Sequence, residues 1–171
     1  MKMKIVVFDS GLGSLSIIKA IQKKTKSDII YLADRKNFPY GTKTKSQLYK
    51  IITDTIEKIS ERFDPDVIVL ASNTPSLLFR EKLPKNVITI LPPLEKIQKP
   101  GNIAILTTEI VVKSKELNNY ISEFNGLKDV LTINCSELVA QKLLNNTLVT
   151  LQSLKSLILM LRVIISTLLL L

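Results

Sequence analysis

The chain has 171 residues, which is enough for one domain or two small ones with a buried core. Its 46% hydrophobic and 23% charged residues are typical of globular proteins and exclude extensive disorder. Histidine is absent and Cys135 is the only cysteine, which excludes histidine-based triads and zinc sites, thiolate clusters and an internal disulfide framework. We therefore expect no metal site. A lone cysteine suits a reducing compartment, so we expect a cytoplasmic protein.

The charge balance is strongly basic, with 24 Lys and Arg against 15 Asp and Glu, for a net charge of +9. A nucleic-acid-binding protein gathers such charges into a patch or stripe. Here the lysines are scattered, and no aromatic residues interleave with them. This distribution favours a solvated lysine-rich surface, and we expect no nucleic-acid partner.

The first half of the chain alternates apolar runs with amphipathic helical patterns. Short apolar runs that end in turns predict buried strands, and apolar residues at helical spacing predict helices. The predicted strands are 4–8, 28–33, 67–71 and 87–91, and the predicted helices are about 15–26, 47–63 and 76–82. This order favours an α/β fold with a parallel sheet covered by helices on both faces, a flavodoxin-like unit over residues 1–98.

The same pattern restarts after Lys99-Pro100-Gly101. We expect strands at 102–106 and 130–133, a helix over 112–124, and another helix from Leu138. This predicts a second, incomplete α/β unit over residues 99–142, with a ligand held between the two units at the carboxyl edges of their sheets. An incomplete unit leaves apolar surface uncovered, which favours self-association into a homo-oligomer.

Residues 143–171 differ abruptly in composition. Leucine supplies 12 of these 29 residues, no carboxylate occurs, and the only charges are Lys155 and Arg162. We interpret this tail as the product of a frameshift. The alternative is a real membrane-associating or oligomerising helix, although the 15 residues from Leu157 to Leu171 are shorter than the roughly 20 that cross a bilayer. Apart from that alternative, no membrane partner is expected.

Polar residues follow the predicted strands and should converge at one edge of the sheet. They are Asp9-Ser10-Gly11, Tyr40-Gly41 and Ser72-Asn73-Thr74. Ordinary structural roles are open for each of them: a helix N-cap for Asp9, packing for Tyr40, and turn formation for Asn73-Thr74. We interpret Gly11-Leu12-Gly13 as a tight turn in which glycine adopts a positive φ. A phosphate-binding loop is the less favoured interpretation, because Ser16 occupies the third glycine position of the nucleotide-binding motif Gly-x-Gly-x-x-Gly.

Taken together, three segments resemble the ordered motifs of glutamate racemase, in the cofactor-independent aspartate/glutamate racemase family. A weaker similarity continues through Leu106–Ser114 and Asn134-Cys135-Ser136, so that the resemblance covers residues 4 to 143. The three segments are Phe8-Asp9-Ser10-Gly11-Leu12-Gly13-Ser14-Leu15-Ser16, Phe38-Pro39-Tyr40-Gly41-Thr42-Lys43 and Ala71-Ser72-Asn73-Thr74-Pro75-Ser76.

The resemblance implies interconversion of L- and D-glutamate without a cofactor, by two bases on opposite faces of Cα, for peptidoglycan synthesis. Both bases are cysteines in the family, and thiols suit the task because their pKa, about 8.5 and lowered by the surroundings, makes a thiolate available near neutral pH. Here Ser72 occupies the position of the first, and the second, from a Cys-Thr-His-Tyr-Pro motif, has no counterpart. The resemblance assigns assistance of the first base to Asp9, a place in the binding region to Thr108, and substrate binding to Ser10, Tyr40, Gly41, Asn73 and Thr74.

We therefore expect a glutamate-racemase-like protein that is impaired or inactive, with glutamate favoured over aspartate as its ligand. Two alternatives remain. One is a non-catalytic binding module for an acidic amino acid or a small carboxylate. The other is a flavodoxin-like nucleotide-binding protein that uses the glycine-containing turn.

Overall fold

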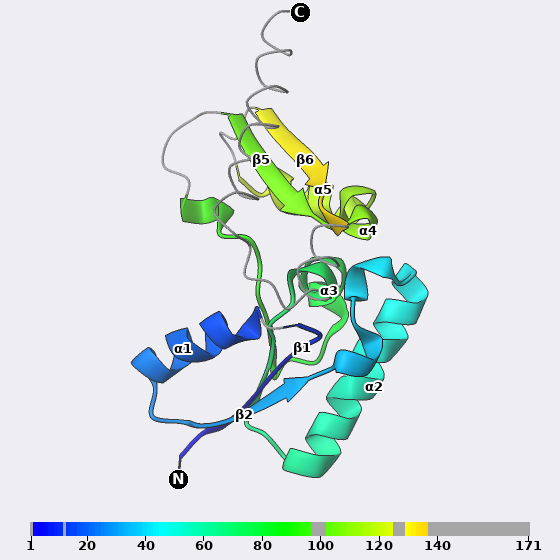
Figure 1. Ribbon diagram of the computed structural model, residues 1–171. Helices are drawn as coiled ribbons and strands as arrows, with labels where there is room; N and C mark the ends of the chain where they lie inside the picture. The colour runs from blue at the N-terminus through cyan, green and yellow to red at the C-terminus, as the bar shows by residue number, and fades with distance from the viewer. Residues whose placement is uncertain (1, 12, 97–101, 125–128, 137–171) are drawn as a thin grey trace, which may run out of the picture. The chain divides into compact units, whose positions relative to one another are not determined.

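A computed structural model describes residues 2–11, 13–96, 102–124 and 129–136 (Figure 1). Met1–Ser136 form one unit by their contacts. The helix predicted from Leu138 and the tail at 143–171 lie outside the described residues, so the frameshift interpretation stays a prediction. Among the described residues, no helix combines the length and hydrophobicity needed to cross a bilayer.

The first sheet has four parallel strands in the order β2-β1-β3-β4. Pairing is in register at Phe8, which lies opposite both Leu32 and Leu70. Because the strands are parallel, their carboxyl ends meet at one edge of the sheet. The strands are β1 (Lys4–Asp9), β2 (Asp28–Ala33), β3 (Val67–Leu70) and β4 (Val87–Thr89).

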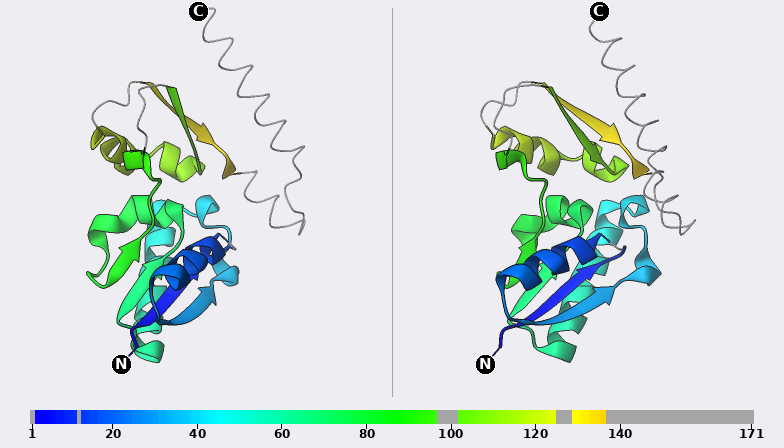
Figure 2. Two further views of the ribbon diagram at one scale, coloured as in Figure 1. Left: turned by 90° about the vertical axis from the view of Figure 1, so that its left-hand side faces the viewer. Right: turned by 60° about the vertical axis from the view of Figure 1, so that its left-hand side comes forward.

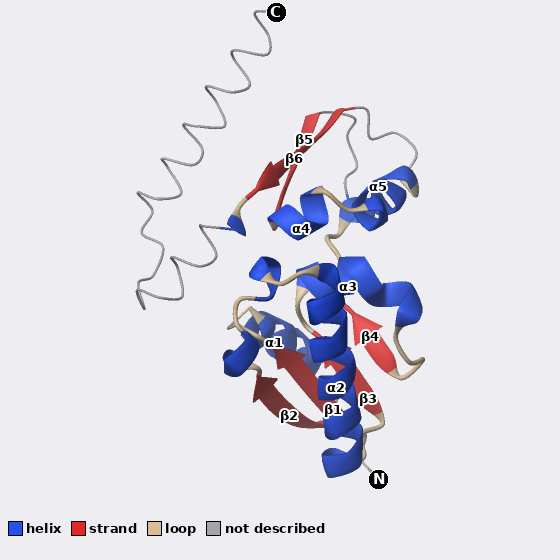
Figure 3. Ribbon diagram, turned by 90° about the vertical axis from the view of Figure 1, so that its right-hand side faces the viewer, coloured by secondary structure: helices blue, strands red, loops and turns tan. Residues whose placement is uncertain are grey.

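Helices cover both faces of this sheet, as the alternation of strands and helices predicts (Figures 2 and 3). Val7 and Val69 pack on one side against α1 (Ser14–Lys24), which contributes Ile17, Ile18 and Ile21. Alternate strand residues point to the other face. There Val6, Phe8, Ile68 and Leu70 join the larger core with α2 (Lys45–Phe63) and α3 (Asn73–Phe79).

Two helices begin earlier than the periodicity predicts. The first turn of α2 includes Lys45 because Thr44 and Gln47 form a capping box, in which each side chain binds the other residue's backbone N–H. The predicted helix 76–82 is instead α3 followed by the short 3-10 helix η3 (Arg80–Lys82). Prediction from apolar spacing missed the polar first turn of α3, which begins at Asn73.

The second sheet has two parallel strands, β5 (Asn102–Thr107) and β6 (Asp129–Asn134). The helix predicted over 112–124 is present as α5 (Lys115–Ser122). It begins later than predicted because the Ser114 hydroxyl caps it by accepting from the Leu117 N–H, and the short helix α4 (Glu109–Val112) precedes it.

The predicted fold class is confirmed. The chain has an α/β fold with a parallel sheet, and the order of the first four strands suits a flavodoxin-like unit. A two-stranded second sheet agrees with an incomplete second unit. The domain boundaries at 98/99 and 142/143 stay predictions.

Candidate functional site

Backbone hydrogen bonds bring the ends of the first three strands together. The Asp34 N–H donates to the Asp9 carbonyl oxygen over 2.7 Å, and the Ala71 N–H donates to the Phe8 carbonyl oxygen over 2.9 Å. Asp9, which ends β1, and Asp34 and Ser72, which follow β2 and β3, therefore lie at one edge of the sheet. The predicted convergence of the strand ends is present in the structure.

Asp9 is the buried carboxyl group at this edge, with a side chain only 7% exposed. Its Oδ1 accepts the Ser10 N–H over 2.7 Å. Burial raises the pKa of Asp9, and hydrogen bonds from the amides of Ser10, Gly11 and Ser14 and from the Ser72 hydroxyl oppose that rise. Since α1 has Gly13 as its N-cap, the cap reading of Asp9 is wrong. The Asp9 carboxyl group is therefore buried at the strand ends, and the Ser72 hydroxyl is among the groups that act on its pKa.

Tyr40 combines a packing role with a polar one. Its ring is 2% exposed and belongs to the main core. Its hydroxyl donates to Asp34 Oδ2 over 2.9 Å. Burial raises the pKa of Tyr40 well above its ordinary value, and the negative charges of Asp34 and Asp9 raise it further. The phenol is therefore neutral near pH 7, and its proton is directed at Asp34.

Asp34 is a site residue that the sequence analysis missed. Both of its carboxylate oxygens also accept from Asn37 Nδ2, each over 2.8 Å. Asn37 belongs to the short 3-10 helix η1 (Arg35–Asn37), and Tyr40 opens a second one, η2 (Tyr40–Thr42). The available signal was an acidic residue directly after a buried strand. Asp34 holds the loop that carries Tyr40 and Gly41.

Gly41 lies against a residue that follows the second sheet. A Cβ atom at Gly41 would lie 2.5 Å from Thr108 Cγ2 and 2.9 Å from Thr108 Cβ, so only glycine fits without a shift. Thr108 Oγ1 in turn lies 3.1 Å from Thr74 Oγ1, a buried hydroxyl-to-hydroxyl hydrogen bond. Gly41, Thr74 and Thr108 are thus brought together from three distant segments.

The remaining predicted residues differ in environment. Ser10 is 8% exposed, Ser72 is half-buried before α3, and Asn73 is exposed at the first residue of that helix. The positive φ expected in the glycine turn is wrong at Gly13, which has φ −60° and caps α1. Cys135 is half-buried after β6, and its burial raises the pKa of the thiol.

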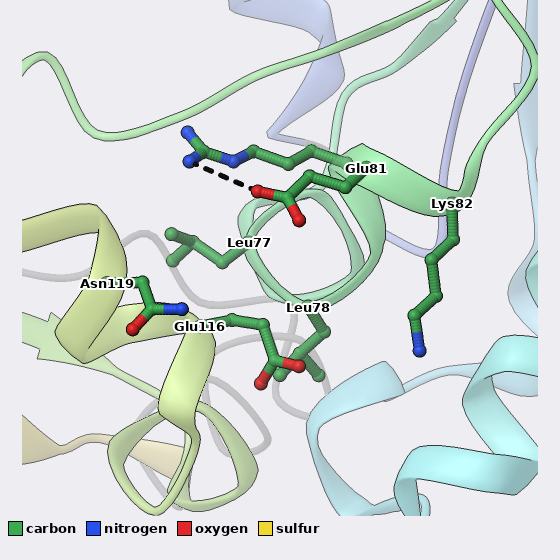
Figure 4. A pocket seen from close by; sticks show the side chains of 7 residues that line it. Leu77, Leu78, Glu81, Lys82, Glu116 and Asn119 are labelled. Atoms are coloured by element: carbon green, nitrogen blue, oxygen red, sulfur yellow. Dashed lines mark ion pairs between the residues drawn. The ribbon is translucent and has the colours of Figure 1, made fainter. Parts of the chain in front are cut away.

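A small cavity lies elsewhere, between α3, η3 and α5 (Figure 4). Its volume is about 50 Å³, enough for very few water molecules. Arg80 forms an ion pair with Glu81, drawn as a dashed line, and another with Glu123 of the segment after α5. None of the eight predicted site residues lines it. The lining residues are Leu77, Leu78, Arg80, Glu81, Lys82, Glu116 and Asn119.

Comparison with known proteins gives one consistent result, although no family model matches the chain. The glutamate racemase of Clostridium novyi is 31% identical over 147 residues, 81% of this chain and 56% of that protein. The Aliivibrio fischeri glutamate racemase is 34% identical over 141 residues, 79% of this chain and 54% of its own length. This chain is similar in sequence to the glutamate racemases. It spans about half the length of these curated relatives.

Solved glutamate racemases also have this fold. The Escherichia coli glutamate racemase, solved with L-glutamate and the activator UDP-MurNAc-Ala, has a TM-score of 0.74 at 26% identity, covering 91% of this chain and 62% of that one. The Aquifex pyrophilus glutamate racemase has a TM-score of 0.66 at 29% identity, covering 76% of this chain and 54% of that one. The resemblance predicted from the motifs is confirmed. The roles of the individual site residues stay predictions.

Proposed function

We propose that this chain is a glutamate-racemase-like protein that binds an acidic amino acid, with glutamate preferred over aspartate, at the sheet edge around Asp9. The observation that carries the proposal is the buried Asp9 carboxyl group, whose raised pKa is opposed by the Ser72 hydroxyl, with Ser72 at the position of the family's first catalytic cysteine. Two glutamate racemases with similar structures were solved with L-glutamate and D-glutamate, which supports glutamate as the ligand.

We propose further that racemisation is impaired or absent in these 171 residues. Two-base chemistry needs one group to remove the Cα proton and another to return a proton on the opposite face. The Ser72 hydroxyl is too weakly acidic to become that base unaided. The only thiol, Cys135, lies after β6 and has a raised pKa. In the family, racemisation supplies D-glutamate for peptidoglycan synthesis. We propose that this chain is cytoplasmic and carries out that reaction poorly.

A binding experiment separates this proposal from its two alternatives. Thermal unfolding is followed with D- and L-glutamate, D- and L-aspartate, FMN and ATP. Stabilisation by the amino acids alone supports the proposed ligand class. Stabilisation by FMN or ATP alone would mean that the chain is a flavodoxin-like nucleotide-binding protein. A non-catalytic binding module gives the first result and no proton exchange in any variant.

Proton exchange in deuterated water tests the catalytic part. NMR spectra of glutamate should show no exchange of the α-proton with the unmodified chain, while Ser72→Cys restores exchange without complete racemisation. The matched control is Ser16→Cys, because Ser16 is exposed on α1. Robust racemisation by the unmodified chain would contradict the assignment of the bases.

A further inference from the structure

A larger groove lies between the end of β2 and the C-terminal half of α2. The groove has a volume of about 510 Å³, within the range of roughly 300–1,000 Å³ for small-molecule sites. Of the eight predicted site residues none lines it, and its only acidic lining residue, Asp34, accepts hydrogen bonds from Tyr40 and Asn37. The two elements can be followed in Figure 1.

The groove has two basic walls. Arg35 and Lys36 of η1 supply one wall, and Lys58 and Arg62 of α2 supply the other. Lys58 and Arg62 are four residues apart on one helix, a spacing at which like charges repel. All four side chains are exposed, and the ion pairs found within residues 2–11, 13–96, 102–124 and 129–136 include none of them.

The floor between these walls is apolar. It consists of Leu32 at the end of β2, Ile59, which is 1% exposed, and Phe63, whose ring lies 5.7 Å from the Arg62 guanidinium carbon. The hydroxyl of Thr55, which also lines the groove, donates to the Ile51 carbonyl oxygen. Recognition in this groove therefore relies on charge and apolar contact.

We propose that this groove binds a small, freely diffusing organic anion with an apolar body. This site is distinct from the proposed amino-acid site at the sheet edge around Asp9. The anionic group lies between the two basic walls, and the apolar body rests on Leu32, Ile59 and Phe63. A bare inorganic ion leaves the apolar floor uncovered. A second copy of the chain is disfavoured because each copy carries a net charge of +9.

Fluorescence titration with anilinonaphthalene sulfonate tests the proposal at low ionic strength. The double change Lys58→Glu with Arg62→Glu should weaken binding at least about tenfold, because it reverses one wall. The matched control is Lys19→Glu with Lys23→Glu, two exposed lysines four residues apart on α1. The control makes the same change in net charge and should alter binding less than about twofold. Equal weakening by both pairs would overturn the proposal.

Competition then identifies the chemistry. Naphthyl phosphate should displace the probe, whereas uncharged naphthol and inorganic phosphate at equal concentration should not. Displacement by naphthol as effective as by naphthyl phosphate would overturn the role of the basic walls. Binding to phosphatidylglycerol vesicles that is lost in the Lys58 and Arg62 variant, without displacement by naphthyl phosphate, would mean a membrane surface instead.

Two further measurements separate this proposal from effects on folding and from the proposed function. Arg35→Glu with Lys36→Glu reverses the opposite wall on a different element and should weaken binding to a similar degree. Glutamate is added in a separate arm, and saturating glutamate should leave the affinity for the probe unchanged. If the unmodified chain binds glutamate but does not bind the probe, this inference alone is contradicted. If it binds the probe but not glutamate, only the proposed function is contradicted.

Discussion

At the scale of single residues, burial decides the behaviour of the two carboxyl groups at the strand ends. Asp9 is buried and its pKa is raised, so ionisation of its side chain opposes folding. Asp34 is half-buried and accepts from Tyr40 and Asn37. The Asp9 carboxyl group therefore holds its proton more readily than an ordinary aspartate does. Asp34 instead organises a loop through its hydrogen bonds.

Asp9→Asn should stabilise the protein at pH 7. A carboxyl group with a raised folded-state pKa contributes stability in full below the ordinary value of 3.8 and loses it as pH rises through the folded-state pKa. Asparagine does not ionise, and its carbonyl keeps the hydrogen bond from the Ser10 N–H. The melting temperature should therefore exceed that of the unmodified chain at pH 7, with the gain disappearing toward pH 3.8. Asp28→Asn, at an exposed position, is the control; a lower melting temperature for Asp9→Asn at pH 7 would contradict the burial argument.

Asp34→Asn should loosen the Tyr40 loop. Replacing a charged acceptor by a neutral one weakens the hydrogen bond from the phenol, and we expect a loss of about 1 kcal/mol in the free energy of unfolding. The pKa of Tyr40 should also fall, because the Asp34 charge is one of the causes that raise it. Urea unfolding measures the loss of stability. The control is Asp54→Asn, which removes an ion-pair partner of Lys50 and should lower the free energy of unfolding by less than about 0.5 kcal/mol. An equal loss in the two variants would contradict the role of Asp34 in holding the Tyr40 loop.

At the scale of elements, the position of α3 depends on one buried hydroxyl group. Ser76 Oγ donates to the Leu70 carbonyl oxygen over 3.1 Å and accepts the Ile90 N–H over 3.2 Å. It therefore ties α3 to the end of β3 and to the chain after β4. Thr74 lies at the start of the same helix, so its place opposite Thr108 depends on that anchor.

Ser76→Ala should lower the free energy of unfolding by about 1–2 kcal/mol, because it leaves two polar backbone groups without their side-chain partner. Chemical denaturation measures the loss. Ser60→Ala is the matched control, since that hydroxyl bonds only to the carbonyl oxygen of Ile56 in its own helix and the residue is exposed. The control should stay within about 0.5 kcal/mol of the unmodified chain. A comparable loss in both variants would show that Ser76 has no special anchoring role.

At the scale of the molecule, contacts between distant segments join the two sheets' helices and loops. Thr108 contacts Gly41 and Thr74, and Lys45 of α2 forms an ion pair with Glu116 of α5. Exposed ion pairs contribute little to stability. Of these contacts, the tight packing of Gly41 against Thr108 should therefore lower the free energy of unfolding most when it is disturbed.

Gly41→Ala should destabilise the chain by about 1–3 kcal/mol, because the new methyl group overlaps the Thr108 side chain. Thr108→Ser removes the methyl group that lies nearest and keeps the hydroxyl bonded to Thr74. The double variant should then lose less stability than the sum of the two single variants, as measured in a double-mutant cycle by urea unfolding. Strict additivity would mean that the two residues do not share this contact.

Local sequence patterns were enough to predict the α/β class, the order of the elements and the family resemblance, because buried strands and turn-forming motifs are each contained in a short segment. It also predicted that the residues following the strands meet at one edge, since parallel strands share a direction. The helix starts at Lys45 and Lys115 were missed because the side chains of Thr44 and Ser114 cap those helices. The start at Asn73 was missed because the first turn of α3 is polar. Only the tertiary structure revealed that Asp34 holds Tyr40 and that Thr108 requires a glycine at Gly41. Those contacts join residues far apart in sequence or on successive turns, where neither periodicity nor composition carries a signal.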